Sequence, residues 1–121
     1  MIIDHVGISV SNYDRAKEFY QTVLATLGYD LIQEIKGWTG FGKDNIPQFW
    51  IGGCDRINNS THVAFVAENK EQIEKFYHAA IDAGAKDNGK PKIRQEYHYH
   101  YYGAFVIDAD GHHIGAVCHK V

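Results

Sequence analysis

The hydrophobic and polar positions in the first half of the chain predict a strand, a helix and three further strands. Residues 2–10 alternate and are rich in β-branched side chains, which is typical of a half-buried strand. A polar stretch at residues 11–14 suits the start of a helix, and from Arg15 to about Leu27 apolar side chains recur at spacings of three and four. Gly28 can end that helix. Three short β-prone segments follow, at residues 29–35, 38–42 and 48–52.

The second half of the chain starts the same order again. Residues 62–66 alternate like a strand, and an amphipathic stretch from Gln72 to Ala83 stops at Gly84. Residues 87–91 are rich in turn-forming residue types, so a turn is expected there. Strands over residues 101–107 and 113–119, joined by a tight turn at residues 108–111, are expected to form a terminal hairpin.

An internal repeat relates the two halves. Moving 57 positions forward carries His5 to His62, and the same offset relates four further identical pairs: Val6 to Val63, Asn12 to Asn69, Phe19 to Phe76 and Tyr20 to Tyr77. Two copies of one unit, each with a sheet that is apolar on one side, bury those faces most simply by packing pseudo-symmetrically around a shared cleft. We expect one domain over residues 1–121, with modules at about residues 1–53 and 60–121 and with function in the cleft.

Composition and charge narrow the class of partner. The 121 residues are 45% hydrophobic and 22% charged, as in ordinary folded proteins, and a net charge of −3 gives no basic footprint for nucleic acid. Cys54 and Cys118 form no C-x-x-C pair, and no segment approaches the roughly 20 apolar residues of a membrane span. The first residues lack a signal-peptide pattern. We therefore expect a cytoplasmic protein without nucleic-acid or membrane partners.

The chain resembles the vicinal oxygen chelate superfamily, which includes glyoxalase I, the bleomycin and fosfomycin resistance proteins and the extradiol dioxygenases. Five segments spread over nearly the whole chain carry the resemblance: DHVGI at residues 4–8, AKEFY at 16–20, LGY at 27–29, THVAF at 61–65 and FVIDADGH at 105–112. The resemblance implies an α+β fold of two pseudo-symmetric βαβββ modules that form a cupped mixed sheet around a central cleft. It also implies a divalent metal, a small organic substrate whose oxygens complete the coordination, and a homodimer.

The resemblance assigns two metal-binding histidines and leaves the third ligand open. Members that bind metal commonly use a histidine opening the first strand, a histidine opening the second unit and a glutamate on the last strand. His5 and His62 match the histidines, whereas the glutamate position aligns with Gly115, which has no ligating atom. Without that carboxylate, two neutral imidazoles hold Mg²⁺, Mn²⁺ or Fe²⁺ weakly.

Other histidines can supply the missing ligand. Strand alternation puts His113 on the same face as Gly115, and His98 or His100 can contribute if their loop folds over the cleft. Three imidazoles and a water suit zinc, while nickel, manganese and iron are the other candidate ions. The alternative is that His5 and His62 are hydrogen-bonded polar groups in a pocket without metal.

Aromatic residues supply the remaining candidates for the substrate pocket. Residues 96–102 combine four tyrosines and two histidines, and such side chains can line a site for a flat or oxygen-rich ligand. The alternative is that half of these rings pack internally or at a dimer contact. Phe49 and Trp50 lie on the counterpart of the last strand, where one of the two should face the cleft, and Trp38 and Phe41 are expected in the core. The predicted pocket residues are Trp50, Tyr97, His98, His100, Tyr101, Tyr102 and Gly115.

Two functions follow from these observations. In the first, a divalent metal held by His5, His62 and a substitute ligand such as His113 polarises a substrate oxygen, in a lyase, isomerase or dioxygenase. In the second, an aromatic cleft binds or sequesters a small organic molecule without chemistry, and the metal site is degenerate. Gly115 and the tyrosine-rich segment favour the second function.

Overall fold

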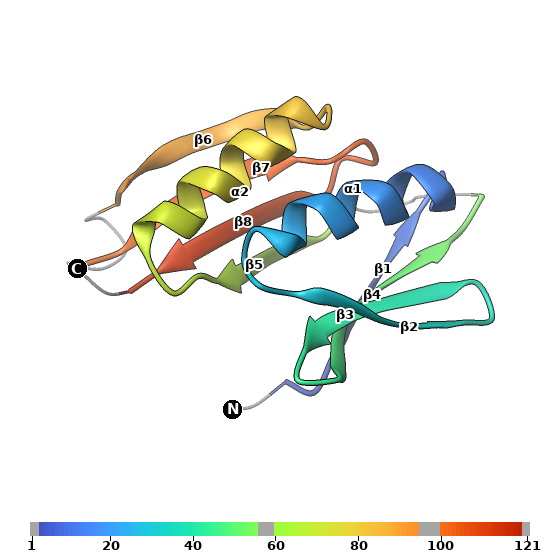
Figure 1. Cartoon of the computed structure of the whole chain (residues 1–121). Coiled ribbons are helices and arrows are strands. Elements are labelled where there is room, and N and C mark those ends of the chain that lie inside the picture. Colours follow the sequence, from blue (N-terminus) through green and yellow to red (C-terminus); the bar gives the residue numbers. More distant parts are fainter. Residues whose placement is uncertain (1–2, 56–59, 95–99, 120–121) are drawn as a thin grey trace. The chain divides into compact units, whose positions relative to one another are not determined.

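The computed structural model describes residues 3–55, 60–94 and 100–119. One element order, strand, helix and three strands, occurs twice along the chain (Figure 1). The strands form two four-stranded sheets, and the chain divides into two compact units, residues 1–59 and 60–121. We call these units the first and the second module. The expected α+β fold of two repeated βαβββ modules is confirmed.

The first module holds five elements: β1 (Val6–Val10), α1 (Tyr13–Ala25), β2 (Asp30–Ile35), β3 (Trp38–Lys43) and β4 (Ile46–Gly53). Its sheet has the order β1-β4-β3-β2. β1 runs parallel to β4, whereas the other neighbouring strands are antiparallel. The parallel pair is joined through α1, β2 and β3, so the first and last strands of the module lie side by side.

The second module repeats this arrangement with β5 (His62–Val66), α2 (Lys70–Asp82), β6 (Lys86–Ile93), β7 (Tyr102–Ile107) and β8 (His113–Cys118). Its sheet has the order β5-β8-β7-β6, with β5 parallel to β8 and the other pairs antiparallel. The expected terminal hairpin is the β7–β8 pair, which turns at residues 108–111.

Both helices begin at asparagines that the internal repeat relates. The side chain of Asn12 accepts a hydrogen bond from the Arg15 N–H at 3.2 Å, and that of Asn69 accepts one from the Gln72 N–H at 2.9 Å. Each helix therefore begins about two residues before its expected start, because apolar periodicity marks only the buried turns and not the polar first turn. Each also ends earlier than expected, α1 at Ala25 and α2 at Asp82.

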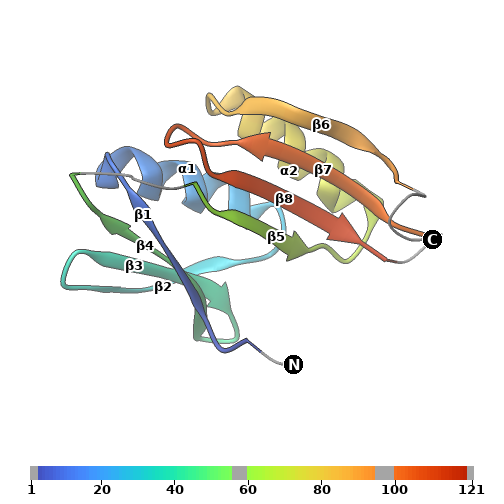
Figure 2. The ribbon, with the colours of Figure 1, turned by 180° about the vertical axis from the view of Figure 1, so that it is seen from behind.

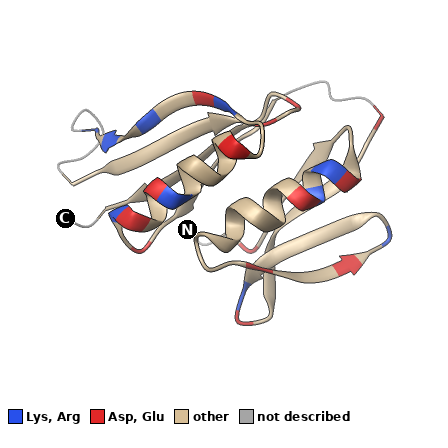
Figure 3. Ribbon diagram, turned by 45° about the horizontal axis from the view of Figure 1, so that its top comes forward, with Lys and Arg blue, Asp and Glu red and all other residues tan. Residues whose placement is uncertain are grey.

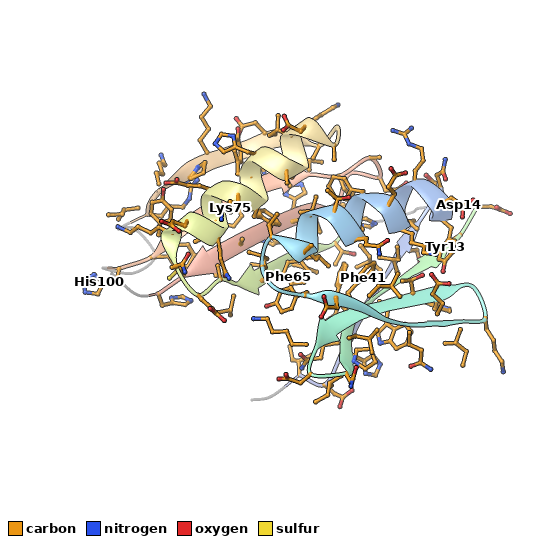
Figure 4. All side chains as sticks on the ribbon, in the orientation of Figure 1. Tyr13, Asp14, Phe41, Phe65, Lys75 and His100 are labelled. Atoms are coloured by element: carbon orange, nitrogen blue, oxygen red, sulfur yellow. The ribbon has the colours of Figure 1, made fainter. Side chains whose placement is uncertain are left out.

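Each helix covers one face of the sheet in its own module. In the first module the ring of Tyr20 on α1 lies 5.2 Å from that of Phe49, and Phe41, which is 1% exposed, lies on the same side (Figure 4). In the second module, Phe76 of α2 and Ile114 of β8 are fully buried. Figure 2 shows the opposite face of each sheet, which carries no helix of its module. We call it the helix-free face.

Two expectations from the sequence are wrong. Residues 87–91 belong to β6 and not to a turn, because their turn-forming residues are absorbed as register shifts on an edge strand, where Gly89 adopts a φ of 151° and Pro91 is tolerated. Trp38 is not in the core but 40% exposed, since the pleat of β3 turns Phe41 toward α1 and Trp38 to the helix-free face.

Charged side chains are concentrated on the helices and on β2 and β6, which form one edge of each sheet. Lysine, arginine and acidic residues alternate along both helices, whereas β1, β4, β5, β7 and β8 contain none (Figure 3). Neither α1 nor α2 has the length and apolar character needed to span a bilayer.

Candidate functional site on the helix-free faces

Two tryptophans lie on the helix-free face of the first module and rest on glycines. In the β3–β4 register Trp38 pairs with Gly52 and Gly40 pairs with Trp50, while Gly7 of β1 pairs with Trp50 from the other side. Paired residues of neighbouring strands point to the same face of a sheet. Phe49, the neighbour of Trp50, points to α1, which settles which of the two lies on the helix-free face.

The glycines are required by the positions of the indole rings. A Cβ atom on Gly52 would lie 2.6 Å from the ring of Trp38, and one on Gly40 would lie 2.9 Å from the ring of Trp50. A normal carbon–carbon contact is about 3.5–4.0 Å, so neither glycine has room for a side chain. Trp38 and Trp50 therefore lie against the backbone of the sheet, and we call the pair the tryptophan platform.

The second module has one aromatic ring at the corresponding place on its helix-free face. Phe105 of β7 pairs with Gly115 of β8, and a Cβ atom on Gly115 would lie 2.5 Å from Cδ1 of Phe105. The pair two positions along joins Gly103 to Val117. The space above Gly115, the position that the resemblance assigns to a metal-binding glutamate, is filled by the phenyl ring.

The register shows that the two modules invert these large and small pairs. Aligned through the repeat, Trp50 corresponds to Gly115 and Gly40 to Phe105, and likewise Trp38 corresponds to Gly103 and Gly52 to Val117. The large side chain thus comes from the opposite strand at both positions. The helix-free faces share a backbone pattern but present different chemistry.

His62 and His113 are neighbours on the helix-free face of the second module. They are paired in the parallel β5–β8 register, and their ring centroids are 6.1 Å apart. The His62 ring also meets Phe105 edge-on at 6.3 Å. Nδ2 of Asn88 lies 3.4 Å from Nδ1 of His113, so the amide of this β6 residue can donate to that nitrogen. The structure thus brings two of the predicted ligands together.

His5 belongs to the first module and lies just before β1. Its Nδ1 atom is 2.7 Å from Oδ1 of Asp4. A carboxylate only accepts hydrogen bonds, so Nδ1 is the donor of this pair, and Nε2 lies outside it. This carboxylate–imidazole pairing is the arrangement that commonly orients a metal-binding histidine.

The tyrosine-rich segment is only partly within the described residues, since Tyr97 and His98 lie outside them. His100 precedes β7 at the end toward which β8 points (Figure 4). Ile107 pairs with His113 and Tyr102 with Cys118, so His100 is separated from His113 by the length of β8, about 17 Å at roughly 3.3 Å per residue. The structure does not bring His100 together with His62 and His113.

The two tyrosines that follow are on opposite faces of the sheet. Tyr101 has its ring 5.3 Å from that of His119 and lies close to Gly103, on the helix-free side. The Tyr102 hydroxyl donates to Oε1 of Glu74 on α2 at 3.2 Å. Burial, and then the bond to Glu74, raise the pKa of Tyr102, because both favour the neutral phenol. Tyr102 thus packs against α2 and not on the face that holds the histidines.

The donor set does not fit the metal centre that the superfamily commonly uses. Among the residues that the structure describes, no three histidine, cysteine or acidic side chains gather closely enough to hold an ion. Gly115 offers no ligating atom, and the Phe105 ring occupies the space that a carboxylate would need. A facial triad needs its carboxylate both as a ligand and to offset the charge of the ion.

A buried histidine that the sequence did not single out positions the start of β5. His112 is 1% exposed, its Nδ1 accepts the Thr61 N–H at 2.9 Å, and its own N–H donates to Oδ1 of Asp108 at 2.8 Å. The Thr61 carbonyl accepts the His113 N–H at 2.7 Å. These bonds fix the backbone on both sides of the His62–His113 pair. A histidine after a tight turn is the only sequence signal for this role.

The fold and these faces define a glyoxalase-type protein, and comparison with known proteins agrees. The model of the Glyoxalase/Bleomycin resistance protein/Dioxygenase superfamily matches residues 2–115. The chain belongs to this superfamily, which confirms the resemblance to vicinal oxygen chelate proteins. A search of curated proteins found no significant match.

Solved structures share the fold over nearly the whole chain. A glyoxalase/bleomycin resistance protein from Albidiferax ferrireducens is 25% identical with a TM-score of 0.79, over 95% of this chain and 97% of that one. A glyoxalase/bleomycin resistance protein/dioxygenase family enzyme from Burkholderia phytofirmans is 18% identical with a TM-score of 0.74, over 99% and 100%. The fosfomycin resistance protein FosX from Listeria monocytogenes, a mutant complexed with Mn(II) and 1S,2S-dihydroxypropylphosphonic acid, is 16% identical with a TM-score of 0.69, over 96% and 90%. The Burkholderia and Listeria proteins are less than 25% identical to this chain, so their similarity shows a shared fold and nothing more.

Proposed function

We propose that this protein binds a small organic molecule with a planar ring system, and that the tryptophan platform of the first module is the ring-binding surface. The observation that carries this proposal is the support of both indoles by glycines. Gly7, Gly40 and Gly52 hold the rings of Trp38 and Trp50 close to the backbone of the sheet, and Trp38 is 40% exposed. This surface supports a binding or sequestering role. Metal-dependent catalysis has weaker support, because Gly115 offers no ligating atom.

The platform favours planar ligands for a physical reason. Rings whose orientation is fixed by the sheet lose little conformational freedom on binding, so most of the stacking energy remains as affinity. Offset stacking of aromatic rings contributes about 0.5–1.5 kcal/mol beyond the area buried. A saturated ligand of the same size gains the burial term only.

Tryptophan fluorescence tests the proposal directly, because Trp38 and Trp50 are the two tryptophans of the chain. Naphthalene-2-methanol should change the emission saturably, and decahydronaphthalene-2-methanol, its saturated counterpart, should bind about twofold to twelvefold more weakly. Trp50→Leu, followed by NMR because it removes one reporter, should lose this preference. Tyr29→Leu, which changes a ring that contacts Lys43 elsewhere in the first module, serves as the matched control.

Equal affinity for the planar and the saturated alcohol would argue against a ring-binding platform. So would an unchanged preference in both Trp50→Leu and Trp38→Leu. We also propose that the protein is cytoplasmic and forms a homodimer. Sedimentation velocity tests the homodimer.

A second candidate function, a metal-dependent lyase, isomerase or dioxygenase, is favoured by the histidines themselves. His62 and His113 are neighbours on one face, and Asp4 orients the His5 imidazole through Nδ1, so that Nε2 is not part of that hydrogen bond. Three imidazoles would suit zinc or nickel better than manganese or iron. This function requires His5 to join the pair from the second module.

Metal analysis separates the two candidates. Elemental analysis after purification without an affinity tag should find stoichiometric metal in the native chain and none in a His5→Ala, His62→Ala double variant if the metal-dependent function is correct. Equal, near-zero metal in both would exclude it. Gly115→Glu combined with Phe105→Ala should raise divalent-metal affinity, since the second change makes room for the carboxylate.

A further inference from the structure

We propose that the helix-free face of the second module by itself binds a small organic oxyanion, a carboxylate or a phosphonate, with Arg94 as its permanent positive charge. This inference concerns the second module alone and goes beyond the ring-binding function proposed for the first. Arg94 follows β6, and its backbone N–H donates to the Tyr101 carbonyl at 2.6 Å. Its guanidinium carbon lies 5.0 Å from the centroid of the Phe105 ring.

The helix-free face of the second module carries basic side chains and no acidic ones in the described register. The residues of β6 that pair with Ile107 and Gly103, and so share the helix-free face, are Lys86 and Lys92. Across the described register, the residues on this face include basic, imidazole and apolar side chains but no aspartate or glutamate. The chain as a whole carries a net charge of −3, so a face without acids is not a general property of its surface.

Asp87, the acidic residue of β6, is turned to the other side of the sheet and is already hydrogen-bonded. Asp87, which pairs with the buried Val106, accepts bonds from the Gly89 N–H and the Tyr77 hydroxyl, both at 3.0 Å. These two bonds, in that order, lower the pKa of Asp87, and Lys90 and Arg94 contribute more weakly. Asp87 is therefore engaged mainly with the Gly89 backbone and the Tyr77 hydroxyl, and within the described part of the chain it forms no salt bridge with Arg94.

The position of Arg94 is fixed before any ligand arrives. Its Nη2 atom donates to the Lys90 carbonyl at 2.8 Å, and its side chain passes over Gly89, where a Cβ atom would lie 2.8 Å from Nη2. Nε is buried and has no hydrogen-bond partner within the described residues. The guanidinium has five N–H donors in a planar fork that matches carboxylate and phosphonate oxygens, and a fixed fork loses less entropy on binding.

Other hydrogen-bond donors on the same face can complete an oxyanion site. Asn88 lies 3.4 Å from Nδ1 of His113, and when its amide donates there the imidazole carries its proton on Nε2. His62 stands beside His113 and contacts Phe105, the ring that also supports Arg94. Phe105 thus connects the cationic and the imidazole parts of the face, and it offers an apolar contact to the carbon skeleton of the ligand.

NMR titration with ring-matched probes tests the proposal on the intact chain. Benzoate, phenylphosphonate and the neutral benzyl alcohol share one ring, so differences among them report the anionic group. We expect both anions to shift the Arg94 side-chain N–H and the His62 and His113 imidazole signals, and to bind more tightly than benzyl alcohol. The two anions distinguish a carboxylate from a phosphonate preference.

Three variants test whether Arg94 supplies the positive charge that binds the anion. A unit charge about 5 Å from the anion, at an effective dielectric constant between about 40 and 80, corresponds to roughly fourfold to fifteenfold in Kd, so Arg94→Gln should weaken anion binding by that factor. Arg94→Lys should retain part of the affinity. Lys75→Gln removes the same charge from the exposed side of α2 and should bind as the native chain does (Figure 4).

Each other outcome overturns the inference in a recognisable way. Equal binding of all three probes, with tryptophan signals shifted, would leave the ring-binding function intact and refute the anion site. Anion-dependent shifts confined to α1, α2 or the first module would also refute it. This titration uses the native chain, so the result does not depend on whether Arg94→Gln folds. If no probe shifts any signal of either helix-free face, the proposed function and this inference both fail.

Discussion

Substituting Gly115 by alanine should destabilise the protein even though alanine is small and the position lies on a strand. The new Cβ would lie 2.5 and 2.6 Å from two carbons of the Phe105 ring. The ring must therefore move by about 1 Å to restore a normal contact of about 3.5 Å. Overpacking of this kind costs typically 1–3 kcal/mol, and we expect the free energy of unfolding to fall by about that amount.

Phe105 is the cause of this penalty, so removing its ring should remove the penalty. In a Phe105→Ala background, Gly115→Ala should be neutral or stabilising by about 0.4–1 kcal/mol, because alanine restricts the unfolded chain more than glycine does. The coupling energy of the double-mutant cycle should thus exceed about 1 kcal/mol. Neither single variant gives this number alone, since Phe105→Ala also loses its own packing.

Urea unfolding at 25 °C, followed by circular dichroism, measures the four stabilities. Gly103→Ala is the matched control on the neighbouring strand, where the closest side-chain atoms would be 3.2 Å from the new Cβ and a smaller cost is expected. A cost below about 0.5 kcal/mol for Gly115→Ala, or a coupling energy indistinguishable from zero, would refute the conclusion that the phenyl ring fills the glutamate position.

Two further predictions concern stability. The Gly89 N–H and the Tyr77 hydroxyl lower the pKa of Asp87 below its ordinary 3.8, so the charged carboxylate stabilises the fold above that pH and the contribution is lost as pH falls through the native pKa. Asp87→Asn should therefore be less stable than the native chain at pH 6, and the difference in the free energy of unfolding by urea should shrink as the pH falls below 3.8. A difference that stays constant through this fall in pH would contradict the prediction. Asn12→Ala and Asn69→Ala should each cost about 1 kcal/mol, and thermal unfolding that shows no loss for either would contradict their capping role.

Much of the fold is predictable from the sequence because local chemistry and the repeat agree. The apolar periodicity of each helix, its asparagine cap and the alternation of residues 62–66 all indicate elements that the structure contains. β6 was missed because Asn88, Gly89 and Pro91 are typical of turns, and only pairing with β7 shows that the sheet accommodates them as register shifts. Such pairing is a long-range property that local residue preferences do not record.

The candidate site was less predictable than the fold. The candidate ligands His5, His62 and His113 follow from motif position and alternation, but the covering of Gly115 by Phe105 depends on register across two strands. The sequence around Arg94 does not indicate its role. That role depends on the side chain passing over Gly89 to the ring of Phe105, eleven residues later (94 to 105). Side-chain direction at the ends of irregular strands is set by tertiary packing.

The exchange of bulky and small partners between the modules has a consequence for how such a repeat can diverge. Replacing only one residue of a large–small pair leaves either two large side chains that collide or two small residues over an unfilled patch of the sheet. Each exchange of the large side chain between strands therefore passed through a less stable intermediate sequence or changed both strands together. A chimera that carries the β3–β4 hairpin of the first module in place of β7–β8 would bring both members of each pair at once. It would exchange a phenyl-covered face for an indole-covered one without creating a collision within the hairpin.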